Sequence, residues 1–165
     1  MTQRGFTLVE AVVAISVFAI GLIAVLQVTL TAKASSEAAR DTVQVSNYLQ
    51  EGLEAIRTIR DATWTNINTD GAYHLNSTNG ANPPWQLIAG STEAVGKYSR
   101  TVTISSVSRE DTDASGTLTA GDRIVASGGT LADASTKKIT VTITWSNGSR
   151  TYSRSVFGYL TDWQA

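Results

Sequence analysis

The feature of the sequence that most constrains its fold is an apolar run over residues 6–26 that contains one strongly polar side chain, Glu10. About 20 apolar residues in a helix are enough to cross the hydrocarbon core of a bilayer. An acid near the centre of a bilayer costs about 2.5 to 3.5 kcal/mol, so an acid within such a run indicates a functional site with a partner. The run therefore predicts a membrane-spanning helix whose carboxylate has a role.

Length and composition limit the rest of the molecule. The chain has 165 residues, 42% of them hydrophobic, which is enough for one folded domain and an appendage. The net charge is −1 and no stretch concentrates Lys and Arg, so nucleic-acid binding is not supported. Cysteine is absent, which excludes disulfides and thiol nucleophiles. The one histidine, His74, lies in a loop-like stretch without a nucleophile nearby, so we predict a solvated side chain and a protein that is not an enzyme.

The apolar run is open to more than one interpretation. Ala32-Lys33-Ala34 has the small-x-small pattern of a signal peptidase site, and a secreted binding domain released after Ala34 is one alternative. Against it, the run is longer than the about 7 to 15 apolar residues of a secretory signal, and an acid serves no purpose in a discarded peptide. The remaining interpretations are a permanent anchor and a leader that is cut at another place.

The segment Arg4-Gly5-Phe6-Thr7-Leu8-Val9-Glu10 resembles the class III signal sequence of type IV pilins and of the pseudopilins of type II secretion. In that pattern a short basic leader ends in Gly, Phe follows, and Glu is the fifth residue of the apolar helix. The resemblance implies that a prepilin peptidase cuts after Gly5 and methylates the amine of Phe6. It divides the chain into a leader (1–5), the transmembrane and assembly half of a helix (6–30) and a globular pilin domain (31–165).

The resemblance also implies a partner for Glu10, the amine of Phe6 on a neighbouring subunit. A buried carboxylate is tolerated when an opposite charge meets it, and loss of one member of such a pair costs about 3 to 5 kcal/mol. The implied function is that of a structural subunit, held in the cytoplasmic membrane before assembly and then polymerised into a homo-oligomeric helical filament on the cell surface. Its implied partners are prepilin peptidase and a pilus or secretion assembly machinery. A minor pseudopilin of a type II secretion system is the alternative.

The helical pattern continues beyond the apolar run. Residues 27–61 contain no proline and a single glycine, Gly52. Apolar residues recur at spacings of three and four and form one amphipathic stripe: Val45, Leu49, Leu53, Ile56 and Ile59. We expect one helix of about 55 residues whose first half is apolar on every side and whose second half covers a domain.

The C-terminal half of the chain has the pattern of an antiparallel sheet. After a stretch at 65–85 that reads as a long loop, KYSRTVTIS (97–105) and KITVTITW (138–145) alternate apolar and polar residues. Asn147-Gly148 accepts the positive φ angles of a tight hairpin turn, and RTYSRSVFGYL (150–160) returns as the last strand. The predicted fold class is α+β, with the stripe of the helix packed on one face of the sheet and Trp145 in the core.

Residues 111–122 have the spacing of a twelve-residue calcium loop. Oxygen ligands stand at the expected positions, a glycine at the sixth position supplies the sharp turn, and the last residue is Asp in place of the usual Glu. Three clustered carboxylates would repel one another without a cation, whereas a solvated turn is the competing interpretation. No other cofactor is expected. The predicted ligands of Ca²⁺ are Asp111, Asp113, Ser115, Thr117 and Asp122.

Overall fold

The computed structural model describes residues 7–78, 80, 84–90, 92–125 and 128–163. The chain divides into two compact units, one up to Gln44 and one from Val45 onward. A single helix, α1 (Leu8–Ala62), contributes its first part to one unit and its last part to the other.

The N-terminal part of α1 is apolar and exposed on all sides, as predicted. Its large side chains are more than half exposed, for example Leu8 (83%) and Phe18 (73%). The helix is long and apolar enough to cross a membrane, by length and composition. This part of the helix contains no proline. The hydroxyl of Ser16 lies against the helix backbone and donates to the Val12 carbonyl at 2.8 Å. The unbroken helix satisfies its own backbone groups, as lipid requires, and Ser16 satisfies its hydroxyl within the same helix.

The C-terminal part of α1 covers the sheet through the predicted stripe. Val45, Leu49, Ile56 and Ile59 are buried, and Leu53 is half-buried. Gly52 faces strand β6 (Leu131–Asn147) so closely that a Cβ atom there would lie 2.8 Å from Cγ1 of Val141. The one glycine in this half of the helix therefore allows the backbone of α1 to approach the sheet.

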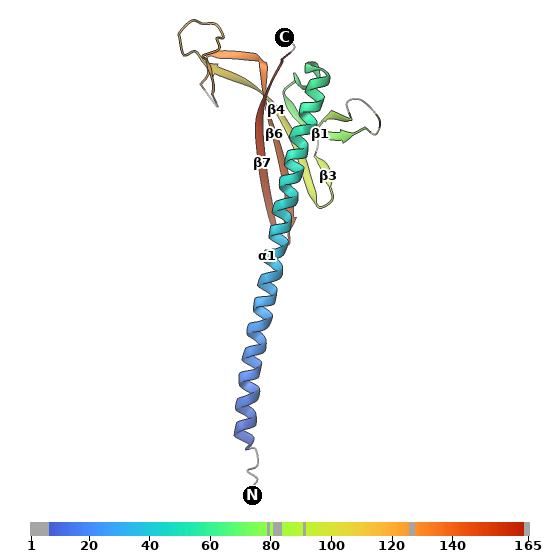
Figure 1. The fold of residues 1–165 in the computed structure, drawn as a ribbon, viewed down its shortest axis with the longest axis vertical. Coiled ribbons are helices and arrows are strands. Elements are labelled where there is room, and N and C mark those ends of the chain that lie inside the picture. Colours follow the sequence, from blue (N-terminus) through green and yellow to red (C-terminus); the bar gives the residue numbers. More distant parts are fainter. Residues whose placement is uncertain (1–6, 79, 81–83, 91, 126–127, 164–165) are drawn as a thin grey trace. The chain divides into compact units, whose positions relative to one another are not determined.

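After α1 come a short 3₁₀ helix, η1 (Trp64–Ile67), and one antiparallel sheet. The strands in chain order are β1 (Gly71–Ser77), β2 (Trp85–Ala89), β3 (Glu93–Val95), β4 (Tyr98–Glu110), β5 (Arg123–Val125), β6 (Leu131–Asn147) and β7 (Arg150–Thr161). The spatial order is β2-β1-β4-β6-β7, with β3 and β5 also paired to β4. Figure 1 shows the last part of α1 over the sheet, with β7 on one side of it and β1 and β3 on the other. The predicted α+β class is confirmed.

The prediction of a long loop at residues 65–85 is wrong, because the segment contains η1 and β1 and ends at the start of β2. Strand β1 buries Leu75, half-buries Tyr73 and is otherwise rich in small and polar residues. It pairs with β2 and with β4, and its partners in β4 lie far along the chain, as in the pair of Tyr73 with Val102. Local composition could not reveal that long-range pairing.

The hairpin turn between β6 and β7 lies one residue further along than predicted. Asn147 pairs with Arg150, so the two central residues of the turn are Gly148 and Ser149. Gly148 has φ +61°, and Ser149 has no positive φ. A glycine at the first central position is the signature of a type II′ turn, which needs one positive φ instead of two.

The core lies between α1 and one face of β4 and β6. Strand β6 alternates as predicted, with Ile139, Val141 and Ile143 fully buried. Trp145 packs against this core but is only half-buried, and its ring lies 5.5 Å from that of Tyr152. On the opposite face, hydroxyl side chains of neighbouring strands stand in register, as in the row Thr101, Thr142 and Ser155.

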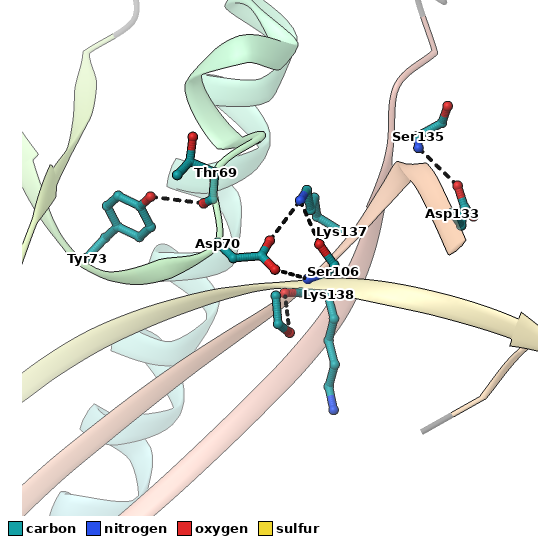
Figure 2. Close-up of polar contacts among 9 residues, drawn as sticks. Thr69, Asp70, Tyr73, Ser106, Asp133, Ser135, Lys137 and Lys138 are labelled. Carbon is teal, nitrogen blue, oxygen red and sulfur yellow. Dashed lines mark hydrogen bonds and ion pairs between the residues drawn. The ribbon is translucent and has the colours of Figure 1, made fainter. Parts of the chain in front are cut away.

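Two buried cations join segments that are distant in sequence. Lys137 is 6% exposed, and its Nζ lies 2.7 Å from Oδ1 of Asp70 and 3.0 Å from the hydroxyl of Ser106 (Figure 2). The other oxygen of Asp70 accepts the Ser106 N–H at 2.9 Å. Arg100, 1% exposed, binds both oxygens of Glu93 at 2.9 Å. These ion pairs fix the crossover after α1 and strand β3 to the centre of the sheet.

Candidate functional site

The first candidate site is the N-terminal segment. Gly5 and Phe6, the predicted residues of cleavage and methylation, lie outside the described residues. Their roles stay predictions. The described chain begins at Thr7, directly before α1.

Glu10 lies in the first turn of α1 and is exposed. Its backbone N–H donates to the hydroxyl of Thr7 at 3.4 Å, and Thr7 and Glu10 have the three-residue spacing of a capping box. A carboxylate in the first turn also faces the positive end of the helix dipole. Among the residues that the structure describes, none forms an ion pair with Glu10. The carboxylate is therefore exposed at the start of the helix.

The surface around Glu10 is suited to lipid or to other copies of the helix. In the N-terminal part of α1, apolar side chains on every side of the helix are exposed from its first residue onward. Such a surface is unfavourable in water, because burying each apolar side chain of this size would gain about 1.5 to 3 kcal/mol of free energy. The exposed large residues of this segment are Leu8, Val9, Val12, Val13, Ile15, Val17, Phe18, Ile20, Leu22, Ile23, Val25, Leu26, Val28 and Leu30.

The second candidate site is the acidic loop between β4 and β5. The structure brings Asp111, Asp113 and Asp122 together, with one carboxylate oxygen of each within 4.8 Å of the others. Gly116 has φ +70°, as the predicted sharp turn requires. The hydroxyl of Ser115 donates to the carbonyl of Thr117 at 3.0 Å. The loop thus gathers the three predicted carboxylate ligands.

Backbone N–H groups hold these carboxylates in place. Asp122 is buried, and it accepts the N–H groups of Thr119 at 2.7 Å and Thr112 at 3.1 Å as well as both threonine hydroxyls. Asp111 accepts the N–H groups of Ser115 at 3.0 Å and Gly116 at 2.8 Å. The backbone N–H groups of Thr119 and Thr112 hold the pKa of Asp122 below its ordinary value. These hydrogen bonds therefore favour the ionised form of Asp122.

The donor set fits a hard cation. All the predicted ligands are oxygen atoms, and Ca²⁺ prefers oxygen ligands. Transition metals other than Mn²⁺ prefer imidazole or thiolate ligands to oxygen. The hydroxyl and backbone N–H of Ser115 lower the pKa of Asp113, so this carboxylate is ionised too. Each carboxylate oxygen of Asp111 accepts one hydrogen bond and keeps a lone pair for a metal. Both oxygens of Asp122 already accept two hydrogen bonds each, from Thr112 and Thr119, so metal binding by Asp122 would displace at least one of them. Calcium binding stays a prediction.

Two residues that support the loop were not foreseen from the sequence. Arg109 donates from Nη1 to the Asp122 carbonyl at 3.0 Å and from Nε to Asp133 at 2.7 Å. Burial raises the pKa of Asp133, but the Thr136 hydroxyl and Arg109 lower it below its ordinary value. Asp133 belongs to β6, so only the pairing of β6 with β4 brings it to Arg109.

His74 differs from its prediction. It lies in β1 and not in a loop, and its Nδ1 atom is buried without a hydrogen-bond partner among the described residues. The alternation of β1 is weak, so its strand character was not visible in the sequence.

Comparison with known proteins identifies the N-terminal segment. Residues 1–26 match the family model of the prokaryotic N-terminal methylation motif. This motif is the signature of type IV pilins and pseudopilins, so the predicted resemblance is confirmed for that part of the chain. No curated protein and no solved structure gives a match.

Proposed function

We propose that the protein is a structural subunit of an extracellular filament of the type IV pilus kind. In this proposal a prepilin peptidase cuts after Gly5 and methylates Phe6, and the subunits polymerise through the N-terminal part of α1. The observation that carries the proposal is the methylation motif over residues 1–26, which is typical of pilin-like and pseudopilin precursors. Proteins with this motif are structural, in agreement with the prediction that the chain is not an enzyme.

The exposed helix supports the polymerisation step. An apolar helix this long is stable in lipid before assembly and is then covered by other copies of itself. The proposed localisation is accordingly the cytoplasmic membrane first and the cell surface afterwards. Besides further copies of the chain, the proposed partners are prepilin peptidase and the assembly machinery.

Glu10 is proposed to fix the position of each incoming subunit. Cleavage would create an α-amino cation at Phe6, and the exposed carboxylate of Glu10 would pair with the amine of a neighbour. Burial of both groups in the helix bundle makes the pairing selective, because an unpaired charge there costs about 3 to 5 kcal/mol.

Intact mass and N-terminal sequencing of the mature protein test the processing. The expected chain starts at Phe6 and carries one methyl group on its amine. A chain that starts at Ser35 would contradict the proposal and would support the alternative of a secreted domain released after Ala34.

Replacement of Glu10 tests the assembly. We expect Glu10→Ala to be cleaved and methylated normally but to lower the affinity between subunits by about two to three orders of magnitude, the equivalent of a stranded charge. The matched control is Glu37→Ala on the same helix, an exposed acid 4.0 Å from Lys33, which should assemble normally. Normal filaments from Glu10→Ala would show that the carboxylate has another role, such as capping α1.

The same processing and assembly chemistry serves a type II secretion pseudopilus, which is the second candidate. Imaging of cells with and without the gene separates the two. A pilus subunit predicts surface filaments that disappear with the gene, whereas a pseudopilin predicts retention of exported enzymes inside the cell.

A further inference from the structure

The sheet of the C-terminal unit has two free edges. Strand β2 pairs with β1 along its whole length, and β7 pairs with β6 from Arg150 to Thr161. Within the described part of the chain, no strand pairs with the outer side of either β2 or β7. Each edge therefore presents unpaired backbone N–H and C=O groups to another chain.

Neither edge carries lysine, proline or a bulge, and only β7 carries charged side chains. Proteins block exposed edges with lysine, proline, bulges or very short strands. β7 is 12 residues long, contains no lysine or proline, carries Arg150 and Arg154 as its only charges, and keeps an unbroken register with β6. β2 contains no charged residue and no proline. Unprotected edges of this kind indicate strands that are covered by a partner.

A cavity borders the edge of β2. It has a volume of about 280 Å³ and is lined by Ile59, Asn66 and three consecutive residues of β2, Trp85, Gln86 and Leu87. Consecutive side chains of a strand point to opposite faces, so a cavity lined by all three runs along the edge of the strand. A strand that pairs with β2 would meet backbone groups and also a space for one of its side chains.

The direction of the strands indicates which partner fits. Every neighbouring pair in the order β2-β1-β4-β6-β7 is antiparallel, so β2 and β7 run in the same direction. Copies in one orientation can therefore extend the sheet when β7 of one copy lies parallel to β2 of the next. Such a head-to-tail contact does not close on itself and gives an open array.

We propose that the edges of β2 and β7 join neighbouring copies of this chain in the assembled filament. The proposal rests on the proposed function, which supplies many copies in one orientation. The five residues of β2 limit the pairing to a short parallel ladder, which is weak alone. The contact forms because the N-terminal helices already hold the copies close together, at a high effective concentration.

Disulfide trapping tests the contact, because the chain has no cysteine of its own. Copies with Gln86→Cys are assembled together with copies that carry one cysteine on the outer face of β7. The β7 variants differ by two residues, because that step preserves the face of the strand: Thr151→Cys, Ser153→Cys, Ser155→Cys, Phe157→Cys and Tyr159→Cys. The control is Thr103→Cys, which is exposed on the same face but lies on the inner strand β4.

The expected result is a disulfide dimer from one of the five mixtures and none from any single variant alone. Filaments that assemble but give no dimer in any mixture would overturn the edge contact and leave the proposed function intact. A dimer from Gln86→Cys alone, or an equal yield from Thr103→Cys, would also overturn it.

A second measurement does not depend on filaments. A dye-labelled peptide of residues 150–161 is titrated with the full chain in detergent micelles up to about millimolar concentration, the range of the effective concentration that linked copies supply, and its fluorescence anisotropy is recorded. We expect saturable binding, at least tenfold weaker binding to Gln86→Lys, and unchanged binding to Gln86→Asn, with equal unfolding midpoints for the three proteins. Equal binding of a scrambled peptide, or no saturation, would overturn the proposal even if the chain forms no filament.

Discussion

Asp70 and Lys137 form an ion pair that joins the crossover after α1 to strand β6. Burial raises the pKa of Asp70, but hydrogen bonds from Lys137 and from Ser106 outweigh it and lower the pKa below its ordinary 3.8. Lys137 is almost fully buried, whereas Asp70 is about half exposed. The carboxylate therefore compensates a cation that has little contact with water.

Asp70→Asn is expected to lower the free energy of unfolding at neutral pH by about 1 to 2 kcal/mol, a value reduced for the exposure of Asp70. Because the pKa of Asp70 is lower in the folded state, its contribution is complete above the unfolded pKa and is lost as the pH falls through the folded one. Urea unfolding at pH 7 and at pH 3 measures both effects, and the difference between variant and parent should shrink at pH 3. The control is Asp61→Asn in an exposed ion pair with Arg60. Equal differences at the two pH values would contradict this account.

The close approach of α1 to the sheet depends on Gly52, the one glycine in the part of the helix that packs on the sheet. We expect Gly52→Ala to destabilise the domain by about 1 to 2 kcal/mol, because the new methyl group would overlap Val141 and outweigh the gain in helix propensity. Gly21→Ala is the matched control, since nothing lies within 4 Å of its Cβ position, and it should leave the unfolding midpoint of the domain unchanged. Circular dichroism during thermal unfolding is the measurement. A midpoint for Gly52→Ala at or above that of the parent would show that α1 can shift away from β6.

The loop between β4 and β5 gives a prediction for metal binding. Millimolar calcium should raise the unfolding midpoint of the parent, because the cation offsets the repulsion among Asp111, Asp113 and Asp122. Asp113→Ala should remove that increase, whereas Asp61→Ala outside the loop should keep it. Differential scanning calorimetry with calcium and with chelator measures the effect. Identical curves for the parent under both conditions would mean that the loop is a hydrogen-bonded turn only.

These elements differ in how far the sequence could predict them. Helix α1 has an uninterrupted apolar run followed by a stripe at spacings of three and four, and residues 138–145 alternate strictly. Neither pattern needs knowledge of its neighbours, and both predictions are confirmed, although β6 starts earlier than predicted, at Leu131. The three aspartates of the loop converge as expected because they are close in sequence. Strand β1 was missed, and so were Arg109 and Asp133, because each depends on pairing between distant segments. The hairpin turn between β6 and β7 was predicted one residue too early. Asn147-Gly148 fits a type I′ turn by composition, and only the strand register shows that Gly148 and Ser149 are the central residues.

The molecule as a whole combines a segment suited to lipid with a domain suited to water. We expect the full chain to stay with the membrane fraction after an alkaline wash and to leave it only with detergent. Phe18→Lys should reduce the membrane-bound fraction, because a lysine near the bilayer centre costs about 2.5 to 3.5 kcal/mol. Val43→Lys, at a similarly exposed position beyond the apolar run of the same helix, is the control and should have no effect. Equal release of both variants would argue against a spanning helix.

The irregularity between β4 and β6 has a consequence for how the domain opens. The register jumps at Ser106, and beyond it β4 pairs only with the first residues of β6 and with β5, in a two-sided ribbon (Figure 1). Among the described residues of this ribbon, Val107 is the one buried apolar side chain. Few buried apolar contacts mean a low free energy of local opening. Amide hydrogens in this ribbon should exchange with solvent well before those of residues 139–143. The ribbon that carries the acidic loop can therefore unfold and refold locally while the sheet covered by α1 stays folded.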